Sequence, residues 1–291
     1  MKIFLCLFLF LSVSLLASAD LNPPPLRFAK LRNPIVLVHG ATMKGSSLDI
    51  GFLHYGEYFR KLPAFLGSTG TPVRVVELTT DSSIGERAAV LKNFLETEMK
   101  GQMVNLICHS LGGLDARYAA SVLHANQIAS ITTIGTPHHG TPLADWAVRQ
   151  KQKHTAWYWF FRLVGYDMEQ RRFLPELSTE YMANTFNSRV PNVPDVKYYS
   201  VQTRASFARR NMSYLLWLTA HWLEGEKSPM AANGHDGLVP FDSQAWGQVV
   251  STGEFDHLAQ INHHEWRYED QSAQVYQSYS EMYGNLFKEG L

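Results

Sequence analysis

The hydrophobic positions of this chain fall into short unbroken runs that alternate with stretches of helical periodicity. The runs are rich in β-branched residues and are bounded by Gly, Pro or polar turns, which is typical of strands buried on both faces. Because such strands alternate with helices, the pattern predicts an α/β fold, a mostly parallel sheet flanked by helices. The predicted strands are residues 34–40, 73–78, 103–108, 128–134, 196–201 and 246–250.

The best-marked helix is predicted over residues 83–100. Ser83 and Glu86 fit a capping box, in which each residue satisfies a backbone N–H at the start of the helix. Apolar residues then recur at helical spacing, and Gly101 follows as a stop signal.

Two segments, residues 144–170 and 210–225, do not fit the alternation of strands and helices. One interpretation is that they are buried helices. The other is a helical lid or cap inserted over a functional site, whose apolar face meets a hydrophobic substrate or a lipid interface. The aromatic lid candidates are Trp157, Trp159, Phe160 and Trp217.

The N-terminus resembles a cleavable signal. Lys2 precedes an apolar run over residues 3–16, and small residues follow up to Ala19, so residues 1–19 are predicted to be a signal peptide. We expect export, to the periplasm or beyond, and a single domain over residues 20–291. Cys108 is then the only cysteine of the mature chain, which excludes an intramolecular disulfide.

The composition adds little beyond a globular class. The chain has 291 residues, 45% of them hydrophobic, and a formal net charge of zero. That balance gives no electrostatic case for binding nucleic acid or an anionic membrane surface.

Ser110 lies where a predicted buried strand meets a predicted helix. A serine at such a corner is held in a strained turn with its hydroxyl exposed, and its neighbours two positions away must be small. Gly112 meets this demand. Cys108 stands where the G-x-S-x-G pattern has its first glycine, which is a departure. The alternative is that Ser110 simply caps the helix.

A serine nucleophile needs a base, and the base needs an orienting carboxylate. In the α/β-hydrolase architecture these follow the serine in the order Asp or Glu, then His, on loops after strands. His257 lies late in the chain on a polar loop, with His263 and His264 as alternatives. Asp236 lies in a tight glycine-flanked turn before it, and Asp242 is the weaker candidate. Asp256 is adjacent to His257, and adjacent side chains rarely pair in this way.

The oxyanion of an acyl-transfer intermediate needs backbone N–H donors. The residue after the nucleophile supplies one, which points to Leu111. The loop after the first predicted strand supplies the other, which points to Ala41, just after His39 and Gly40.

Five motifs of this chain, and the order in which they occur, resemble those of secreted proteobacterial triacylglycerol lipases. The resemblance runs from Pro34 to about Asn262. It implies an α/β-hydrolase fold, a Ser110–Asp236–His257 triad, an oxyanion hole at Ala41 and Leu111, and a mobile lid. The motifs are Val38-His39-Gly40, His109-Ser110-Leu111-Gly112-Gly113, Gly135-Thr136-Pro137-His138-His139-Gly140, Asp236-Gly237-Leu238-Val239-Pro240 and Asp256-His257-Leu258.

The chain departs from these lipases at their calcium site. Many of them hold a structural calcium with an aspartate two residues after the catalytic histidine and a glutamine six after it. Ala259 and His263 occupy those positions here, and neither suits calcium. We therefore expect no calcium site and no cofactor. Some of these lipases also carry a disulfide, which this chain cannot form. Whether it needs the membrane foldase of some relatives therefore stays open. A zinc site at His138, His139, His263 and His264 has no supporting spacing.

The sequence therefore predicts an exported serine carboxylic-ester hydrolase, a triacylglycerol lipase that acts through an acyl-enzyme on Ser110. The expected substrate is a lipid or another ester, including one presented at a lipid–water interface. Short-chain esterase, phospholipase, thioesterase and acyltransferase activities use the same triad and stay open. The alternative from another functional class is a catalytically silent lipid-binding protein on a hydrolase scaffold. The oligomeric state does not follow from the sequence.

Overall fold

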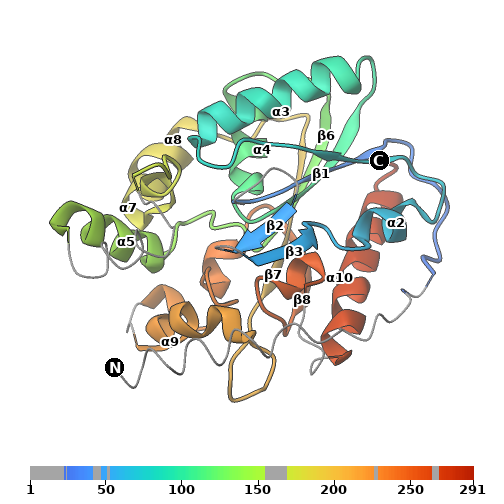
Figure 1. The fold of residues 1–291 in the computed structure, drawn as a ribbon. Coiled ribbons are helices and arrows are strands. Elements are labelled where there is room, and N and C mark those ends of the chain that lie inside the picture. Colours follow the sequence, from blue (N-terminus) through green and yellow to red (C-terminus); the bar gives the residue numbers. More distant parts are fainter. Residues whose placement is uncertain are drawn as a thin grey trace.

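A parallel sheet forms the centre of the molecule (Figure 1). The computed structural model describes residues 23, 25–41, 47–50, 53–154, 169–225, 229–263 and 269–291. Within these residues the sheet has six strands in the order β4-β1-β5-β6-β7-β8, and each neighbouring pair is parallel. Its strands are β1 (Ile35–Val38), β4 (Val73–Val76), β5 (Val104–His109), β6 (Ile128–Ile134), β7 (Lys197–Thr203) and β8 (Gln248–Gly253), and a separate antiparallel pair is β2 (Ser47–Ile50) and β3 (Leu53–Glu57).

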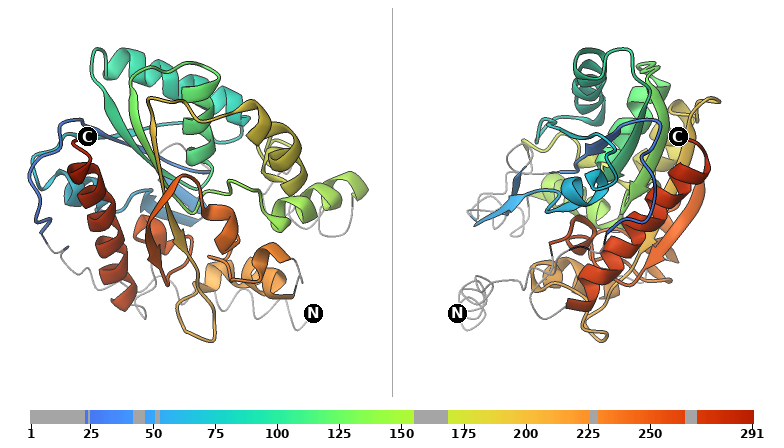
Figure 2. Two further views of the ribbon diagram at one scale, coloured as in Figure 1. Left: turned by 180° about the vertical axis from the view of Figure 1, so that it is seen from behind. Right: turned by 90° about the vertical axis from the view of Figure 1, so that its right-hand side faces the viewer.

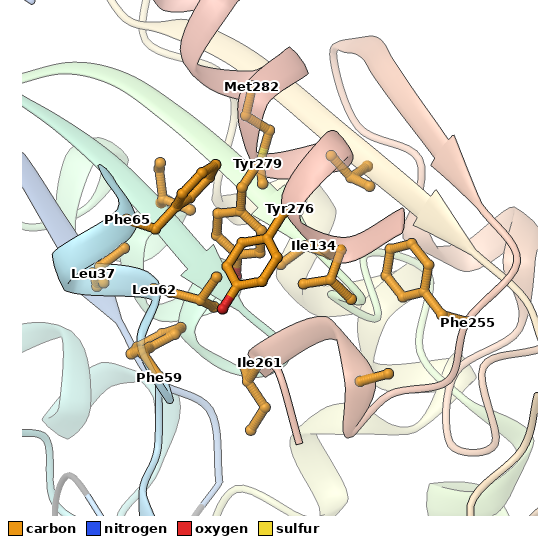
Figure 3. Packing of buried hydrophobic residues seen from close by; sticks show 14 of the residues in the cluster. Leu37, Phe59, Leu62, Phe65, Ile134, Phe255, Ile261, Tyr276, Tyr279 and Met282 are labelled. Carbon is orange, nitrogen blue, oxygen red and sulfur yellow. The ribbon is translucent and has the colours of Figure 1, made fainter. Parts of the chain in front are cut away.

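Helices cover both faces of the sheet, as the unbroken apolar runs predict. On one face, Leu37 of β1 lies in a buried cluster with Phe65 of α2 (Leu62–Gly67) and Tyr279 of α10 (Glu269–Lys288), as Figure 3 shows. Val36 and Val38 pack against α3 and α4 on the other face. Figure 2 shows α3 and α10 on either side of the strands in both views. The helices are α2 (Leu62–Gly67), α3 (Ile84–Glu98), α4 (Gly112–Ser121), α5 (Pro142–Lys153), α7 (Thr179–Tyr181), α8 (Asn187–Arg189), α9 (Trp217–Gly225) and α10 (Glu269–Lys288).

Short single turns fill the connections between these elements. Most are 3₁₀ turns, and η2 is a π-helical turn. They are η1 (Pro175–Leu177), η2 (Met182–Phe186), η3 (Tyr214–Leu216), η4 (Pro229–Ala231), η5 (Phe241–Gln244) and η6 (Ala259–Ile261).

The predicted capping box at the start of α3 is confirmed. The Ser83 hydroxyl accepts a hydrogen bond from the Glu86 N–H, and the Glu86 carboxylate accepts one from the Ser83 N–H. The exchange satisfies two N–H groups that have no partner inside the helix.

The connections that follow β1 and β5 diverge at the carboxyl ends of these neighbouring strands. The helix after β1 packs on one face of the sheet, whereas the helix after β5 packs on the other. Loops that leave neighbouring parallel strands toward opposite faces open a crevice at the carboxyl ends of the strands. The loop after β1 and the turn at Ser110 both lie there.

The second lid candidate is half exposed. The segment from η3 to α9 buries Leu216, Ala220 and Leu223, yet Trp217 and Leu218 remain 47% and 43% exposed. The interpretation of this segment as a fully buried helix is therefore wrong. Residues 155–168, which include Trp157, Trp159 and Phe160, lie outside the described residues, as does the predicted signal peptide, residues 1–19. In the part of the chain that the structure describes, no helix has the length and apolarity needed to cross a bilayer.

Candidate active site

The backbone of Ser110 adopts the strained turn that its position predicts. Its φ is 55°, in the left-handed region that non-glycine residues avoid. Its N–H donates to the Ile134 carbonyl of β6 at 2.9 Å, which anchors the turn to the sheet. A Cβ on Gly40 would lie 2.7 Å from the Ser110 Cβ, and one on Gly112 would lie 2.6 Å from the Val38 carbonyl oxygen. Both glycines are therefore required by close approach of the backbone.

The structure brings Asp236 and His257 together. Their carboxylate Oδ2 and ring Nδ1 lie 2.8 Å apart, and both side chains are buried. The other carboxylate oxygen accepts the N–H groups of Leu238 and Val239 at 3.0 and 2.7 Å. The His257 N–H also donates to the Asp236 carbonyl at 2.8 Å, so the two loops are joined through backbone and side chain alike.

His257 also lies beside the strand that leads to Ser110. Its ring centroid is 4.5 Å from that of His109, the last residue of β5. With Nδ1 donating its hydrogen to the Asp236 carboxylate, Nε2 is left free to accept a proton.

The alternative acids are engaged elsewhere. Asp242 binds the Asn233 amide on the surface. Asp256 is buried and accepts the backbone N–H groups of Ser213, Leu258 and Ala259. Burial raises the pKa of the Asp256 carboxyl to about 7.

The alternative base His263 is engaged as well. Its Nε2 donates to the Glu57 carbonyl oxygen at 2.8 Å, in the loop between η6 and α10 rather than on a helix surface. His264 lies outside the described residues.

Leu111 stands at the N-terminus of α4. The first hydrogen bonds of this helix are donated by Gly113, to the Ser110 carbonyl, and by Leu114 and Asp115, to the Leu111 carbonyl. The Leu111 N–H precedes them and, like the other first N–H groups of a helix, has no partner within the helix. The positive end of the helix dipole favours an anion at this point.

The loop after β1, residues 39–41, is held by a buried arginine; we call it the β1 loop. Arg87 of α3 donates from Nη2 to the carbonyl oxygens of His39 and Gly40 at 2.9 and 3.2 Å. His39 Nδ1 donates to the Gly40 carbonyl at 2.8 Å, while Nε2 accepts the Leu78 N–H. Burial lowers the pKa of the His39 ring to about 4, which keeps this neutral donor–acceptor arrangement.

This anchoring fixes the direction of the Ala41 N–H. In a trans peptide the N–H points opposite to the preceding C=O, and the Gly40 C=O is held by Arg87 and His39. The same arginine forms a buried ion pair with Asp115 of α4 at 2.8 Å. Sequence reasoning missed both charged residues. The available signal was a charged side chain on the apolar face of a helix, between Ile84 and Leu91.

The described residues form no metal cluster. No group of three His, Cys, Asp or Glu side chains among them has the arrangement to hold an ion. Ala259 is buried without a side-chain oxygen, and the His263 ring binds a backbone carbonyl. These two positions do not fit the calcium ion of the lipases that the sequence resembles.

The comparisons with known proteins point to one family. Residues 69–215, half of the chain, match the family described as "PGAP1-like alpha/beta domain". The chain is 34% identical over 220 residues to triacylglycerol lipase 2 of Saccharomyces cerevisiae, which covers 71% of this chain and 62% of that protein. It is 36% identical over 124 residues to a triacylglycerol lipase of Pseudarthrobacter phenanthrenivorans, which covers 40% of this chain and 37% of that protein.

Solved structures show the same fold. A metagenomic carboxyl esterase superposes with a TM-score of 0.68, covering 94% of this chain and 80% of that chain at 18% identity. This similarity confirms the predicted α/β-hydrolase fold. The chain spans less than two thirds of the length of the curated relatives it matches.

Proposed function

Because the chain belongs to the PGAP1-like alpha/beta domain family, we propose that it is an exported serine carboxylic-ester hydrolase of the triacylglycerol lipase type. The observation that carries the proposal is the 2.8 Å hydrogen bond between Asp236 and His257, whose ring packs against the residue before a serine in a strained turn. The names of the relatives support the ester-hydrolase class. Export rests on the sequence of residues 1–19 alone.

In the proposed mechanism the Ser110 hydroxyl oxygen attacks the ester carbonyl carbon while His257 Nε2 takes its proton. Asp236 holds the imidazole and stabilises its positive charge. The N–H groups of Ala41 and Leu111 bind the oxyanion. The C–O bond to the alcohol then breaks, and His257 protonates the leaving alcohol.

Water completes the reaction on the acyl-enzyme. It attacks the acyl carbon as His257 removes its proton, the bond to Ser110 breaks, and the proton returns to the serine. The carboxylic acid leaves and the free enzyme is restored. No step requires a cofactor.

An exposed aromatic surface beside the site supports a lipid substrate. Tyr214, Trp217 and Leu218 are each at least 42% exposed on η3 and α9. This segment is tied to the active-site loops, since the Ser213 N–H binds Asp256 and a Cβ at Gly237 would lie 2.8 Å from Leu216. An apolar surface of this kind suits a lipid interface better than bulk water.

The rate of ester hydrolysis against substrate concentration tests the lipase proposal. We expect the rate on a long-chain triglyceride to rise sharply once an emulsion forms, because the aromatic surface binds the interface. Purified mature protein would be compared with Ser110→Ala on the emulsion and on a short soluble ester. Saturation below the solubility limit with no activity on the emulsion would identify a short-chain esterase instead. Lipid binding without hydrolysis would identify a silent lipid-binding protein.

A pair of surface variants tests whether α9 causes the rise in rate on the emulsion. We expect Trp217→Ser to lower the rate on the emulsion by about tenfold, from the apolar contact that is lost. Met103→Ser is the control, because Met103 is similarly exposed, at 45%, and lies just before β5 rather than on α9. Equal loss in both variants would mean that α9 does not bind lipid.

We propose that activity and stability do not depend on calcium. Ala259 offers no ligand and the His263 ring nitrogen is engaged with Glu57. The expected result is that excess EDTA changes the hydrolysis rate and the Tm by no more than the experimental error. A fall in either value that added calcium restores would contradict the proposal.

A further inference from the structure

A row of buried polar side chains joins the two halves of the candidate active site. We propose that Tyr58, His109 and Gln260 are positioning residues for ester hydrolysis, which hold the β1 loop in register with the Asp236 carboxylate. The inference rests on the proposed function. It assigns to these side chains no contact with substrate.

The carboxylate of Asp236 sets the orientation of the Gln260 amide. Gln260 Nε2 lies 2.9 Å from Asp236 Oδ2 and 2.6 Å from the hydroxyl of Thr203. An ionised carboxylate only accepts hydrogen bonds, so the NH₂ group of the amide must face it. The amide oxygen then faces the opposite way, toward His109.

The amide oxygen in turn fixes the tautomer of His109. His109 Nε2 lies 2.8 Å from Gln260 Oε1 and must carry the hydrogen, because an amide oxygen only accepts. Nδ1 is then the acceptor, and Tyr58 Oη donates to it at 2.6 Å. Burial lowers the pKa of His109 well below its usual value, which keeps the ring neutral.

The last link reaches the β1 loop. The Tyr58 hydroxyl donates its hydrogen bond to His109, and its oxygen accepts the Gly40 N–H at 3.0 Å. Burial raises the pKa of Tyr58 far above its usual value, so the hydroxyl keeps its proton. Every hydrogen bond between Gly40 and Asp236 therefore points toward Asp236, and the negative charge of Asp236 favours that order.

The environment makes this arrangement rigid. Tyr58, His109, Gln260 and Asp236 are each at most 3% exposed, and hydrogen bonds in such surroundings strengthen one another. A Cβ at Gly135 would collide with the Gln260 amide oxygen, so the side chain lies against bare backbone. Removing one member leaves two buried groups without partners, which is costly.

The consequence concerns the geometry of catalysis. This row of hydrogen bonds ends on the Gly40 N–H, whereas Arg87 and His39 donate to the Gly40 carbonyl. Gly40 lies against Ser110 and precedes Ala41, the proposed oxyanion donor. A small shift of Gly40 would therefore displace the oxyanion donor from the position where charge develops, and the loss would fall on kcat.

The experiment is a double-mutant cycle with Tyr58→Phe and Gln260→Met, measured as kcat and KM on a short soluble ester. Each single variant is expected to lower kcat by about tenfold or more, less than the 10²–10³ typical of removing an oxyanion donor itself. KM should stay within about twofold. The double variant should be no slower than the slower single variant, because either change already interrupts the same row of hydrogen bonds.

A matched control separates this role from packing. Tyr283 is a buried tyrosine of α10 whose hydroxyl donates to the Ala29 carbonyl and also bonds the hydroxyls of Thr69 and Thr71, which lie before β4. Tyr283→Phe removes the same atom and should leave kcat within about twofold of wild type, whatever its Tm. If Gln260→Met folds poorly, the kcat of Tyr58→Phe compared with that of Tyr283→Phe tests the proposal.

Two results would overturn the proposal. One is a Tyr58→Phe enzyme with the kcat of wild type. The other is a double variant whose loss is the product of the single losses, which would mean independent packing effects. A wild-type protein that hydrolyses no ester would instead refute the proposed function, so the two failures are distinguishable.

Discussion

Ser110→Ala is expected to lower kcat for ester hydrolysis by about 10⁴- to 10⁶-fold, the range seen when a triad serine is lost. The loss follows because no other group can form the acyl-enzyme. Initial rates on a soluble ester, with folding checked by circular dichroism, measure the effect. A folded Ser110→Ala protein that retains a tenth of the wild-type rate would exclude Ser110 as the nucleophile.

The companion variant Ser110→Gly separates strain from chemistry. A non-glycine residue in the left-handed region costs about 1–2 kcal/mol, and glycine relieves most of that cost. Ser110→Gly should therefore be inactive yet about 1 kcal/mol more stable than Ser110→Ala in urea unfolding. Equal stability of the two variants would mean that the turn is not strained.

Arg87→Met is expected to destabilise the fold by about 3–5 kcal/mol, because it leaves the buried carboxylate of Asp115 without its partner. It also removes the hydrogen bonds that Arg87 donates to the carbonyls of His39 and Gly40, so kcat should fall as well. The free energy of unfolding in urea measures the first effect. Lys92→Met is the control on the same helix, since its ion pair with Glu96 is exposed and worth less than about 1 kcal/mol.

The double variant Arg87→Met with Asp115→Leu separates stability from catalysis. Replacing both charges by apolar groups removes the unpaired carboxylate, so most of the lost stability should return. The kcat should remain low, because Arg87 no longer holds the His39 and Gly40 carbonyls and the His39 ring alone is left on the Gly40 carbonyl. Full recovery of kcat would show that the β1 loop does not depend on Arg87.

Much of the fold follows from the sequence because hydrophobic runs and turn residues act locally. The runs at residues 128–134 and 34–40 contain the observed β6 and β1, and the capping box marks the start of α3. The prediction was poorer for β8, which covers Gln248–Gly253 instead of 246–250. As an edge strand it is largely exposed, so its residues need not be apolar.

The candidate site likewise contains residues that the sequence marks and residues that it does not. Ser110 is marked by its own flanking residues, and Asp236 and His257 by their place in the order of the chain. Arg87, Tyr58 and Gln260 carry no such mark, since the partners that place them in the site lie 18 to 151 positions away in sequence. Only the folded backbone brings them together, as the bond from Tyr58 to His109 illustrates across 51 positions.

The most direct test of the central claim is treatment of the folded protein with an alkyl fluorophosphonate, followed by mass spectrometry of its peptides. Attack by an activated serine expels fluoride and leaves a phosphonyl group on that oxygen. The account predicts one adduct on the peptide that contains Ser110, and none in Ser110→Ala. An unlabelled wild-type protein, or an adduct that persists in Ser110→Ala, would contradict it.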